Sequence, residues 1–169
     1  VLIGIAASGR TPYVVSGCEY AKNIGAVTGC IVTSPNSILE ATVDYPIVAV
    51  TGPEVITGST RMKSGTAQKM ICNMISTAAM VKMGKVYQNL MVDVQPTNEK
   101  LVSRAIRILC DASGVSEDIA KEKLMKFKGV KKALFSILSG IDNEKEVTDI
   151  LNSQKGHIRK ALNKVGIYD

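Results

Sequence analysis

The sequence predicts an α/β protein, with part of a doubly wound parallel sheet followed by a small all-helical tail. Short apolar runs alternate with helical segments over the first half of the chain, which is the pattern of βαβ units. Beyond about residue 96 the pattern changes to one helix after another. The chain has 169 residues, of which 46% are hydrophobic, so it is long enough for one domain with a substantial core.

The first predicted strand covers residues 1–7, where apolar and small residues follow one another without a polar interruption. The loop 8–12, SGRTP, comes next. Thr11 can cap the following helix, Pro12 suits its first position, and Gly25 ends it after about residue 23. Hydroxyls and free amides at a helix start can hold an anion. From these residues alone, an ordinary capped turn is an equally good interpretation.

Two further strands are predicted at residues 26–33 and 45–50, separated by a break at 34–37 and a short helical piece. Ligands of such sheets bind beyond the carboxyl ends of the strands. Ser8 and Glu54 each follow a strand end, so both side chains could face one crevice.

The next predicted helix runs from Ser59 to about residue 83. We expect Ser59 or Thr60 to cap it. The cations Arg61 and Lys63 then lie in the first turn, where the macrodipole disfavours each by ~0.3–1 kcal/mol. This combination indicates a site for an anion such as phosphate, and a helix with solvated basic residues at its start is the alternative.

The second half of that helix is apolar on nearly all sides, which predicts burial within the domain or against a second subunit. The helical tail then begins. Helices are predicted at 98–111, 116–126, 130–139, 143–153 and 156–164, with caps at Ser116, at Asp142 or Asn143, and at Gly156. We place the domain boundary so that residues 1–108 form one domain and residues 109–169 a small helical subdomain.

Cysteine and histidine content argues against a metal site and a disulfide framework. The four cysteines are widely separated, no CxxC pair exists, and His157 is the single histidine. We interpret the cysteines as small buried thiols in a reducing cytoplasm and His157 as a surface residue of a helix. No apolar run approaches the ~20 residues that span a bilayer, and the start lacks a signal-peptide pattern. Because residues 1–3 already continue a strand, we expect a fragment or a chain that begins within its fold.

The net charge of +6 includes a cluster of lysines at positions 126, 128, 131 and 132 that could contact nucleic acid or an acidic partner. Regularly spaced apolar residues surround these lysines, and no aromatic stacking platform accompanies them. We therefore interpret the cluster as a solvated helix face and expect neither a nucleic acid nor a membrane as partner.

Residues 52–69, GPEVITGSTRMKSGTAQK, resemble the signature of N-acetylmuramic acid 6-phosphate etherases and the glucokinase regulatory protein, both of the sugar isomerase superfamily. Residues 7–12, ASGRTP, resemble the phosphate loop of that superfamily, in which hydroxyls and loop amides hold the sugar phosphate. The resemblance implies that Arg10 is an outer contact and that Glu54 binds a polar group of the sugar. The implied substrate-binding residues are Ser8, Gly9, Arg10, Thr11, Glu54, Ser59, Thr60, Arg61 and Lys63.

The resemblance also implies a reaction. Etherases of this family are carbon–oxygen lyases that convert N-acetylmuramic acid 6-phosphate to N-acetylglucosamine 6-phosphate and D-lactate, in cell-wall amino sugar recycling. A base removes the proton next to the C1 aldehyde of the open-chain sugar, lactate leaves, and water adds to the resulting alkene. Two glutamates of the family carry the protons, and neither a metal nor an organic cofactor is needed.

In the family those glutamates lie upstream of the strand with which this chain begins, and no position here matches them. We therefore expect the chain to be the C-terminal part of a cytoplasmic, homodimeric etherase, inactive by itself. Residues 111–127 resemble the ubiquitin-associated-like bundle at the end of these etherases; helices that simply pack on the sheet domain are the alternative. A non-catalytic phosphosugar-sensing domain, akin to the glucokinase regulatory protein, is the competing function.

Overall fold

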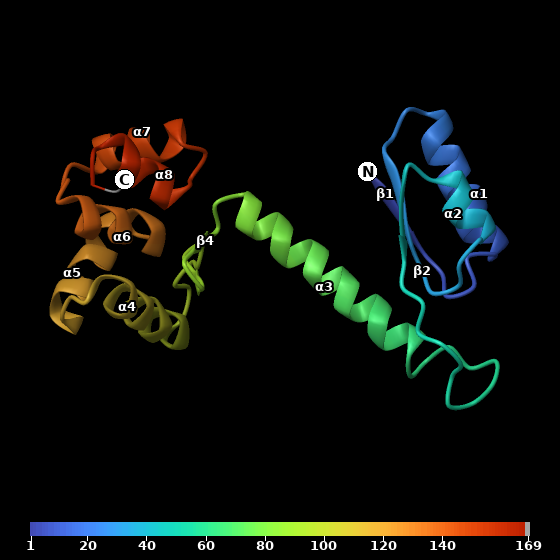
Figure 1. Cartoon of the computed structure of the whole chain (residues 1–169). Helices are drawn as coiled ribbons and strands as arrows, with labels where there is room; N and C mark the ends of the chain where they lie inside the picture. The colour runs from blue at the N-terminus through green and yellow to red at the C-terminus, as the bar shows by residue number, and fades with distance from the viewer. Residues whose placement is uncertain (168–169) are drawn as a thin grey trace. The chain divides into compact units, whose positions relative to one another are not determined.

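The computed structural model describes residues 1–167 of the chain. It divides into two compact units, Val1–Ser76 and a second unit from Thr77 onward, and each is described by itself (Figure 1). The division falls within helix α3 (Ser64–Lys82). The boundary expected at residues 108–109 falls inside helix α4 (Glu99–Ser113), all of which belongs to the second unit.

The first unit contains a three-stranded parallel sheet, which confirms the α/β class. Its strands β1 (Leu2–Ile5), β2 (Thr28–Val32) and β3 (Tyr45–Val48) lie in the order β1-β2-β3. Helices α1 (Pro12–Asn23) and α2 (Ile38–Thr42) cover one face of this sheet (Figure 1). The parallel register aligns the carboxyl ends of the strands at one edge, where the connecting loops emerge.

The core of the first unit lies between the sheet and α1 and α2. A Cβ added at Gly4 would lie 2.8 Å from Cys18 Sγ, so the glycine lets α1 approach β1 closely. Burial raises the pKa of the Cys18 and Cys30 thiols. Cys72 and Cys110 are only partly buried, so the expectation of four buried thiols is confirmed for two of them. The buried residues of this core are Val15, Cys18, Cys30, Val32, Leu39 and Val43.

The opposite face of the sheet is apolar and uncovered by α1 and α2. Gly29 of the central strand pairs with Ile3 on one side and Tyr45 on the other, and Ile31 pairs with Ile5 and Ile47 in the same way. The exposed fractions are 42% for Ile3, 45% for Ile5, 69% for Tyr45 and 39% for Ile47. Apolar side chains on both faces are typical of a parallel sheet that is covered on both sides.

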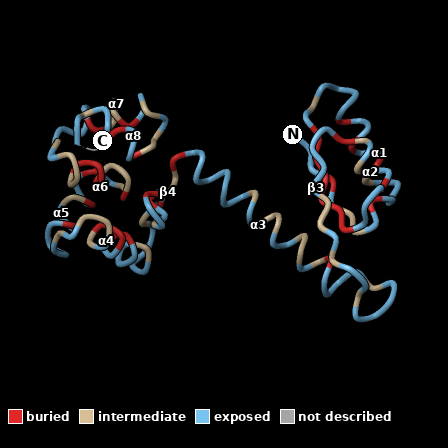
Figure 2. Tube along the Cα trace, in the orientation of Figure 1, coloured by how far each residue is buried: buried red, intermediate tan, exposed pale blue. Residues whose placement is uncertain are grey.

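Helix α3 is largely exposed within this chain, as its pale colour in Figure 2 shows. Its one buried residue among those described is Ser64 at the start. Met70, Met74 and Val81, which share a helical face, are 54%, 64% and 49% exposed. Of the two predicted alternatives, burial within the domain is not seen among the described residues, and burial against a second subunit stays a prediction.

The second unit consists of a short hairpin and a helical bundle. The hairpin pairs β4 (Val86–Tyr87) with β5 (Leu90–Met91). After α4 the bundle contains α5 (Glu117–Phe127), α6 (Val130–Ser139), α7 (Glu144–Ser153) and α8 (Ile158–Lys164). The predicted helices match these within a few residues. Fully buried side chains include Leu109, Phe127, Leu134, Phe135 and Leu162.

The helix caps of the second unit follow the sequence in part. Asn143 Oδ1 accepts hydrogen bonds from the amides of Lys145 and Glu146, as its predicted capping role requires. At the last helix, however, the N-cap is His157 and not Gly156. His157 is half-buried, and its ring lies close to Gly84: a Cβ added at Gly84 would be 3.0 Å from the ring. His157 is therefore not an ordinary surface residue.

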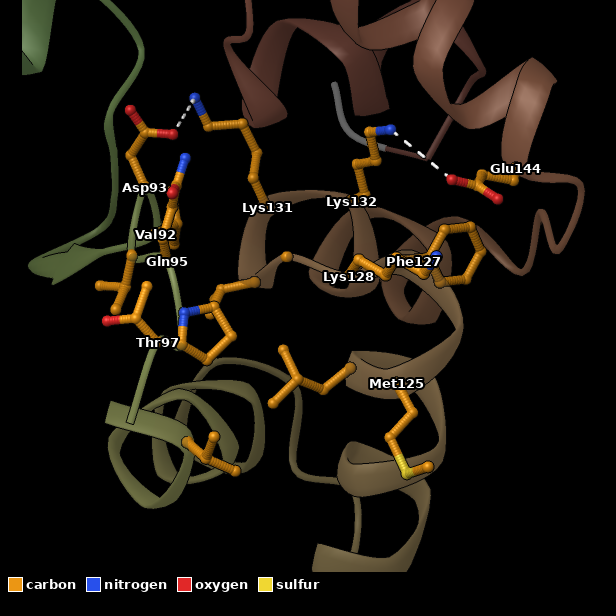
Figure 3. Close-up of a pocket in the computed structure, with 16 residues that line it drawn as sticks. Val92, Asp93, Gln95, Thr97, Met125, Phe127, Lys128, Lys131, Lys132 and Glu144 are labelled. Atoms are coloured by element: carbon orange, nitrogen blue, oxygen red, sulfur yellow. Dashed lines mark ion pairs between the residues drawn. The ribbon is translucent and has the colours of Figure 1, made fainter. Parts of the chain in front are cut away.

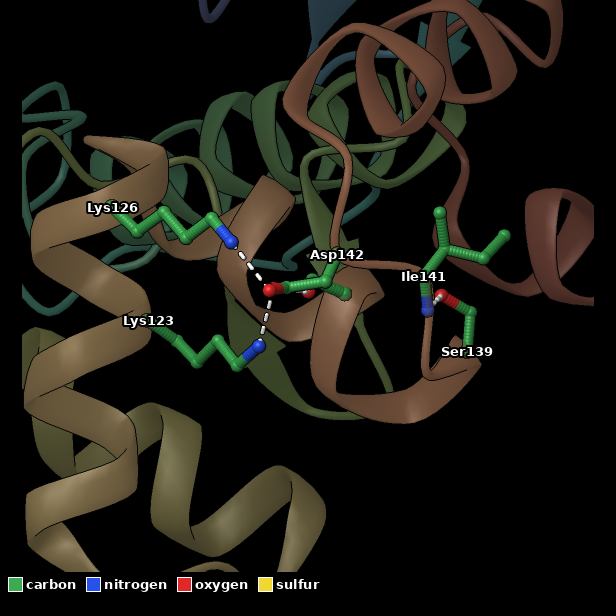
Figure 4. Close-up of polar contacts among 6 residues, drawn as sticks. Lys123, Lys126, Ser139, Ile141 and Asp142 are labelled. Carbon is green, nitrogen blue, oxygen red and sulfur yellow. Dashed lines mark hydrogen bonds and ion pairs between the residues drawn. The ribbon is translucent and has the colours of Figure 1, made fainter.

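Several lysines of the second unit form local ion pairs. Lys123 and Lys126 both donate to the Asp142 carboxylate (Figure 4), and they lower its pKa to about 2. Lys131 pairs with Asp93 at 3.6 Å. Such pairing leaves less charge for a polyanion. None of the helices in the described part of the chain combines the length and apolar character that a membrane crossing requires.

Candidate functional site

The first predicted loop connects β1 to α1 at the carboxyl edge of the sheet. Gly9 is buried with φ +62, a conformation that favours glycine, while Ser8, Arg10 and Thr11 are exposed. Ser8 Oγ accepts a hydrogen bond from the Arg10 amide at 3.3 Å. Thr11 occupies the N-cap of α1, but its side chain forms no capping hydrogen bond. The Thr11 hydroxyl is therefore available for a ligand.

The second loop ends where α3 begins, and it differs from the prediction. The helix begins at Ser64, not at Ser59, and the predicted caps Ser59 and Thr60 precede it. The cap is instead the carboxylate of Glu54, which accepts hydrogen bonds from the amides of Lys63 at 3.0 Å and Ser64 at 2.9 Å. These backbone donors hold the pKa of Glu54 below its ordinary value.

The residues expected in the first turn of α3 lie in the turn before it. The Ser59 amide donates to Ile56 O at 3.0 Å, and Thr60 O accepts from the Gly65 amide at 3.1 Å. Arg61 and Lys63 are both exposed, so the cations reach solvent ahead of the helix. The prediction that they lie in its first turn is wrong, because the helix begins at Ser64. The negative charge that a helix start favours comes from Glu54, seven positions before Arg61 and nine before Lys63.

A chain of hydroxyl groups joins the two loops. Thr33 Oγ1 donates to the carbonyl oxygen of Ala7, the residue before Ser8, at 3.1 Å. It also lies 3.0 Å from Ser64 Oγ. Thr51 Oγ1 lies 3.4 Å from the same Ser64 hydroxyl. The contacts link the ends of all three strands of the sheet to the start of α3. Both loops therefore emerge at one edge of the first unit, and the prediction that Ser8 and Glu54 face one crevice stays a prediction.

Sequence reasoning missed the residues that make this connection. Thr33 and Thr51 follow β2 and β3 closely, so a hydroxyl after each strand end was a signal that could have been used. Ser64 is 4% exposed and had no signal of its own. Gln68 was also missed: its Nε2 donates to Ile31 O at 3.3 Å and ties α3 to β2.

The two loops carry hydroxyls and cations, and their one acidic residue is Glu54. Arg10, Arg61 and Lys63 form no ion pair with any described residue. Both oxygens of Glu54 already accept backbone hydrogen bonds. Within the described residues no group of His, Cys, Asp and Glu could hold a metal ion. The arrangement suits a polar anion such as a phosphate ester.

Comparison with known proteins places the chain. The family model of the C-terminal lid domain of glucokinase regulatory protein matches residues 88–167. An N-acetylmuramic acid 6-phosphate etherase of Clostridioides difficile is 54% identical over 98% of this chain and 54% of its own length. By sequence, this chain belongs to the N-acetylmuramic acid 6-phosphate etherase family. The etherase of Geobacillus thermodenitrificans is 55% identical over 96% of the chain, and that of an Exiguobacterium species 52% over 95%.

These comparisons confirm the resemblance, including the expected C-terminal position. The chain spans about half the length of the curated etherases that it matches, 54–55% of each. The matched lid domain starts at residue 88, so it falls in the second unit, while all of the predicted binding residues lie in the first.

A hollow of about 840 Å³ lies in the second unit of this etherase-family chain (Figure 3). Lys131 and Lys132 line it, but they pair with Asp93 and Glu144, as the dashed lines show. None of the predicted binding residues, all of which are described, lines this hollow. The loop edge of the first unit therefore remains the candidate site.

Proposed function

We propose that this chain is the phosphosugar-binding part of an etherase that cleaves the lactyl ether of N-acetylmuramic acid 6-phosphate. The observation that supports it best is the meeting of two signature loops at one sheet edge through Thr33 and Ser64. The relatives at 50–55% identity carry this etherase activity in their names. The products would be N-acetylglucosamine 6-phosphate and D-lactate.

In this proposal the first loop holds the phosphate. The Ser8 and Thr11 hydroxyls and the Gly9 amide bind its oxygens, and Arg10 adds an outer positive charge. Arg61 and Lys63 provide further charge from the second loop, beside the Ser59 and Thr60 hydroxyls. Positive charge that no ion pair among the described residues neutralises favours a dianionic ester.

Glu54 has a different role from a catalytic acid or base. Its carboxylate accepts two backbone amides, and its pKa lies below the ordinary value, so it stays ionised at neutral pH. A general acid needs a raised pKa, and a base needs an accessible lone pair. We propose that Glu54 orders the second loop and reaches the sugar only through its remaining acceptor capacity. The elimination and hydration steps would then need carboxylates outside this chain, which alone would not turn over.

The apolar face of α3 supports the expected homodimer. Met70, Met74 and Val81 lie along one side of the helix and are about half exposed or more. A contiguous apolar surface of this kind marks a protein interface. We propose that a second subunit covers it in a cytoplasmic enzyme. We also propose that the sheet has the sugar isomerase topology and that the helices of the tail have a ubiquitin-associated-like arrangement.

A non-catalytic phosphosugar sensor is the second candidate, because the lid-domain model of glucokinase regulatory protein matches residues 88–167. Lactate release from N-acetylmuramic acid 6-phosphate by the full-length protein separates the two. Release supports the etherase. Tight binding of the sugar phosphate without any lactate supports the sensor.

Binding to the 169-residue chain tests the site itself. Calorimetry with N-acetylglucosamine 6-phosphate should show binding that the double change Ser8→Ala and Ser59→Ala abolishes. The matched control changes Ser16 and Ser76, which are exposed helix residues, to alanine and should leave the affinity unchanged. Equal affinity of the Ser8 and Ser59 variant and the unchanged chain would rule out the assigned pocket. Turnover by this chain alone would rule out the proposed location of the catalytic carboxylates.

A further inference from the structure

We propose that Ser37, at the start of α2, is a positioning residue for the Ser8–Thr11 loop. The proposal rests on the proposed function, because it explains how the phosphate-binding loop keeps its shape. Ser37 is 4% exposed, so it does not contact the ligand itself. It acts through Gly9, which lies directly against it.

The contact between Gly9 and Ser37 leaves no space for a side chain. A Cβ added at Gly9 would lie 2.3 Å from Ser37 Oγ and 2.5 Å from Ser37 Cβ. On its other side the same Cβ would lie 3.1 Å from Val32 Cγ1. The loop is therefore confined between the end of β2 and the start of α2, with Ser37 as one wall.

A hydrogen bond fixes the loop to the same helix. Gly9 O accepts from the Leu39 amide at 3.0 Å. The amide of Leu39 is one of the first amides of α2, which have no partner inside the helix. The neighbouring Glu40 amide donates to Ser37 Oγ at 3.2 Å. The helix start is thus occupied by the loop and by Ser37, and is not itself an anion site.

Ser37 also determines whether α2 forms. This helix has only five residues, Ile38–Thr42, and short helices depend on their caps. Ser37 and Glu40 form a reciprocal capping box, in which Glu40 Oε2 accepts from the Ser37 amide at 3.3 Å. Loss of the cap would release the Leu39 amide and with it the Gly9 carbonyl. The Ser8 hydroxyl and Gly9 amide would then lose their fixed positions.

The test is the affinity of the 169-residue chain for N-acetylglucosamine 6-phosphate and for inorganic phosphate. Ser37→Ala should weaken both by about tenfold, because the loop must then be ordered on binding. Ser37→Thr keeps the capping oxygen and should restore most of the affinity. Glu40→Ala removes the other half of the capping box and should give a smaller loss.

Asn143→Ala is the matched control, since it removes a cap that accepts two amides in the second unit. It should lower the melting temperature about as much as Ser37→Ala without a change in phosphate affinity. Unchanged affinity in both Ser37→Ala and Glu40→Ala would overturn the proposal. If Ser37→Ala does not fold, Glu40→Ala alone decides by the same criterion.

Hydrogen exchange at the Leu39 amide separates this proposal from the proposed function. It should be faster in Ser37→Ala than in the unchanged chain, whether or not a ligand binds. Absence of phosphate binding by the unchanged chain would count against the function. Unchanged exchange at Leu39 would count against the positioning role alone.

Discussion

Thr33 and Ser64 are 31 positions apart in the sequence, and their hydroxyl oxygens lie 3.0 Å apart in the first unit. Thr33 follows β2, and Ser64 opens α3. The backbone amide of Ser64 holds Glu54, while the Thr33 hydroxyl reaches the carbonyl before Ser8. One buried pair of hydroxyls therefore connects the two loops.

Replacement of Ser64 by alanine should weaken this connection. The variant should lose about 1–2 kcal/mol of unfolding free energy, because Thr33 and Thr51 lose a buried hydroxyl partner. Chemical denaturation measures this directly. Ser76→Ala, which removes an exposed hydroxyl bonded to Asn73 O on the same helix, should cost much less. Equal losses would show that the network contributes no more than a surface hydrogen bond.

Gly9→Ala should both destabilise the chain and abolish binding of the sugar phosphate. Its φ of +62 and the 2.3 Å approach to Ser37 Oγ predict a loss of about 1–3 kcal/mol. Gly17 provides the control, because a Cβ there has no atom within 4 Å in helix α1. Gly17→Ala should be neutral or stabilising by up to about 1 kcal/mol. Thermal melts and calorimetry of both variants test the contrast.

Glu54→Gln should loosen the start of α3. The amide group of glutamine presents one acceptor where the carboxylate presents two, and it brings a donor toward the Lys63 or Ser64 amide. We expect faster hydrogen exchange at both amides and a sugar-phosphate affinity lower by about tenfold. Glu19→Gln, an exposed glutamate of α1, is the control. Normal exchange at the Lys63 and Ser64 amides would contradict the capping role.

The second unit should lose stability in acid through Asp142. An aspartate in an unfolded chain has a pKa of about 3.9, and Lys123 and Lys126 lower that of Asp142 to about 2 in the folded chain. Its contribution is therefore complete above the unfolded value and declines as the pH falls from about 4 toward 2. The melting temperatures of the unchanged chain and of Asp142→Asn should converge over this range. Asp149→Asn, at an exposed site without an ion pair among the described residues, should show a constant difference.

A charge on the apolar side of α3 should disrupt self-association. Met74, 64% exposed in the single chain, is the test position, and Met74→Glu should shift the protein toward the monomer in analytical ultracentrifugation. Met125, 78% exposed in the second unit, provides the control with the same substitution. A monomeric unchanged chain would contradict the proposed interface.

The sequence predicted the strands and helices well where neighbouring residues, such as apolar runs and helix caps, determine them. The strands and most helix bounds follow from apolar runs, Gly25 and the caps Thr11 and Asn143. The start of α3 was placed too early, because Ser59 and Thr60 have the composition of caps. The actual cap, Glu54, acts across a turn, and such a contact has no signature in local composition.

The sequence could relate the two loops of the candidate site to one edge of the sheet, but not predict the contacts between them. Two loops after parallel strands must emerge at the same edge, so Ser8 and Glu54 could be related without coordinates. The link through Thr33 and Ser64 depends on how α3 packs against β2, which periodicity does not determine. The sequence left open whether the domain or a second subunit covers the apolar side of α3, because apolar periodicity identifies a face to be covered but not the molecule that covers it.

The bare face of the sheet, with Ile3, Ile5, Tyr45 and Ile47, has a practical consequence. Environment-sensitive dyes such as anilinonaphthalene sulfonate should fluoresce with the native chain, so their signal here does not report a molten state. The same face should make concentrated samples precipitate on warming before the sheet itself unfolds.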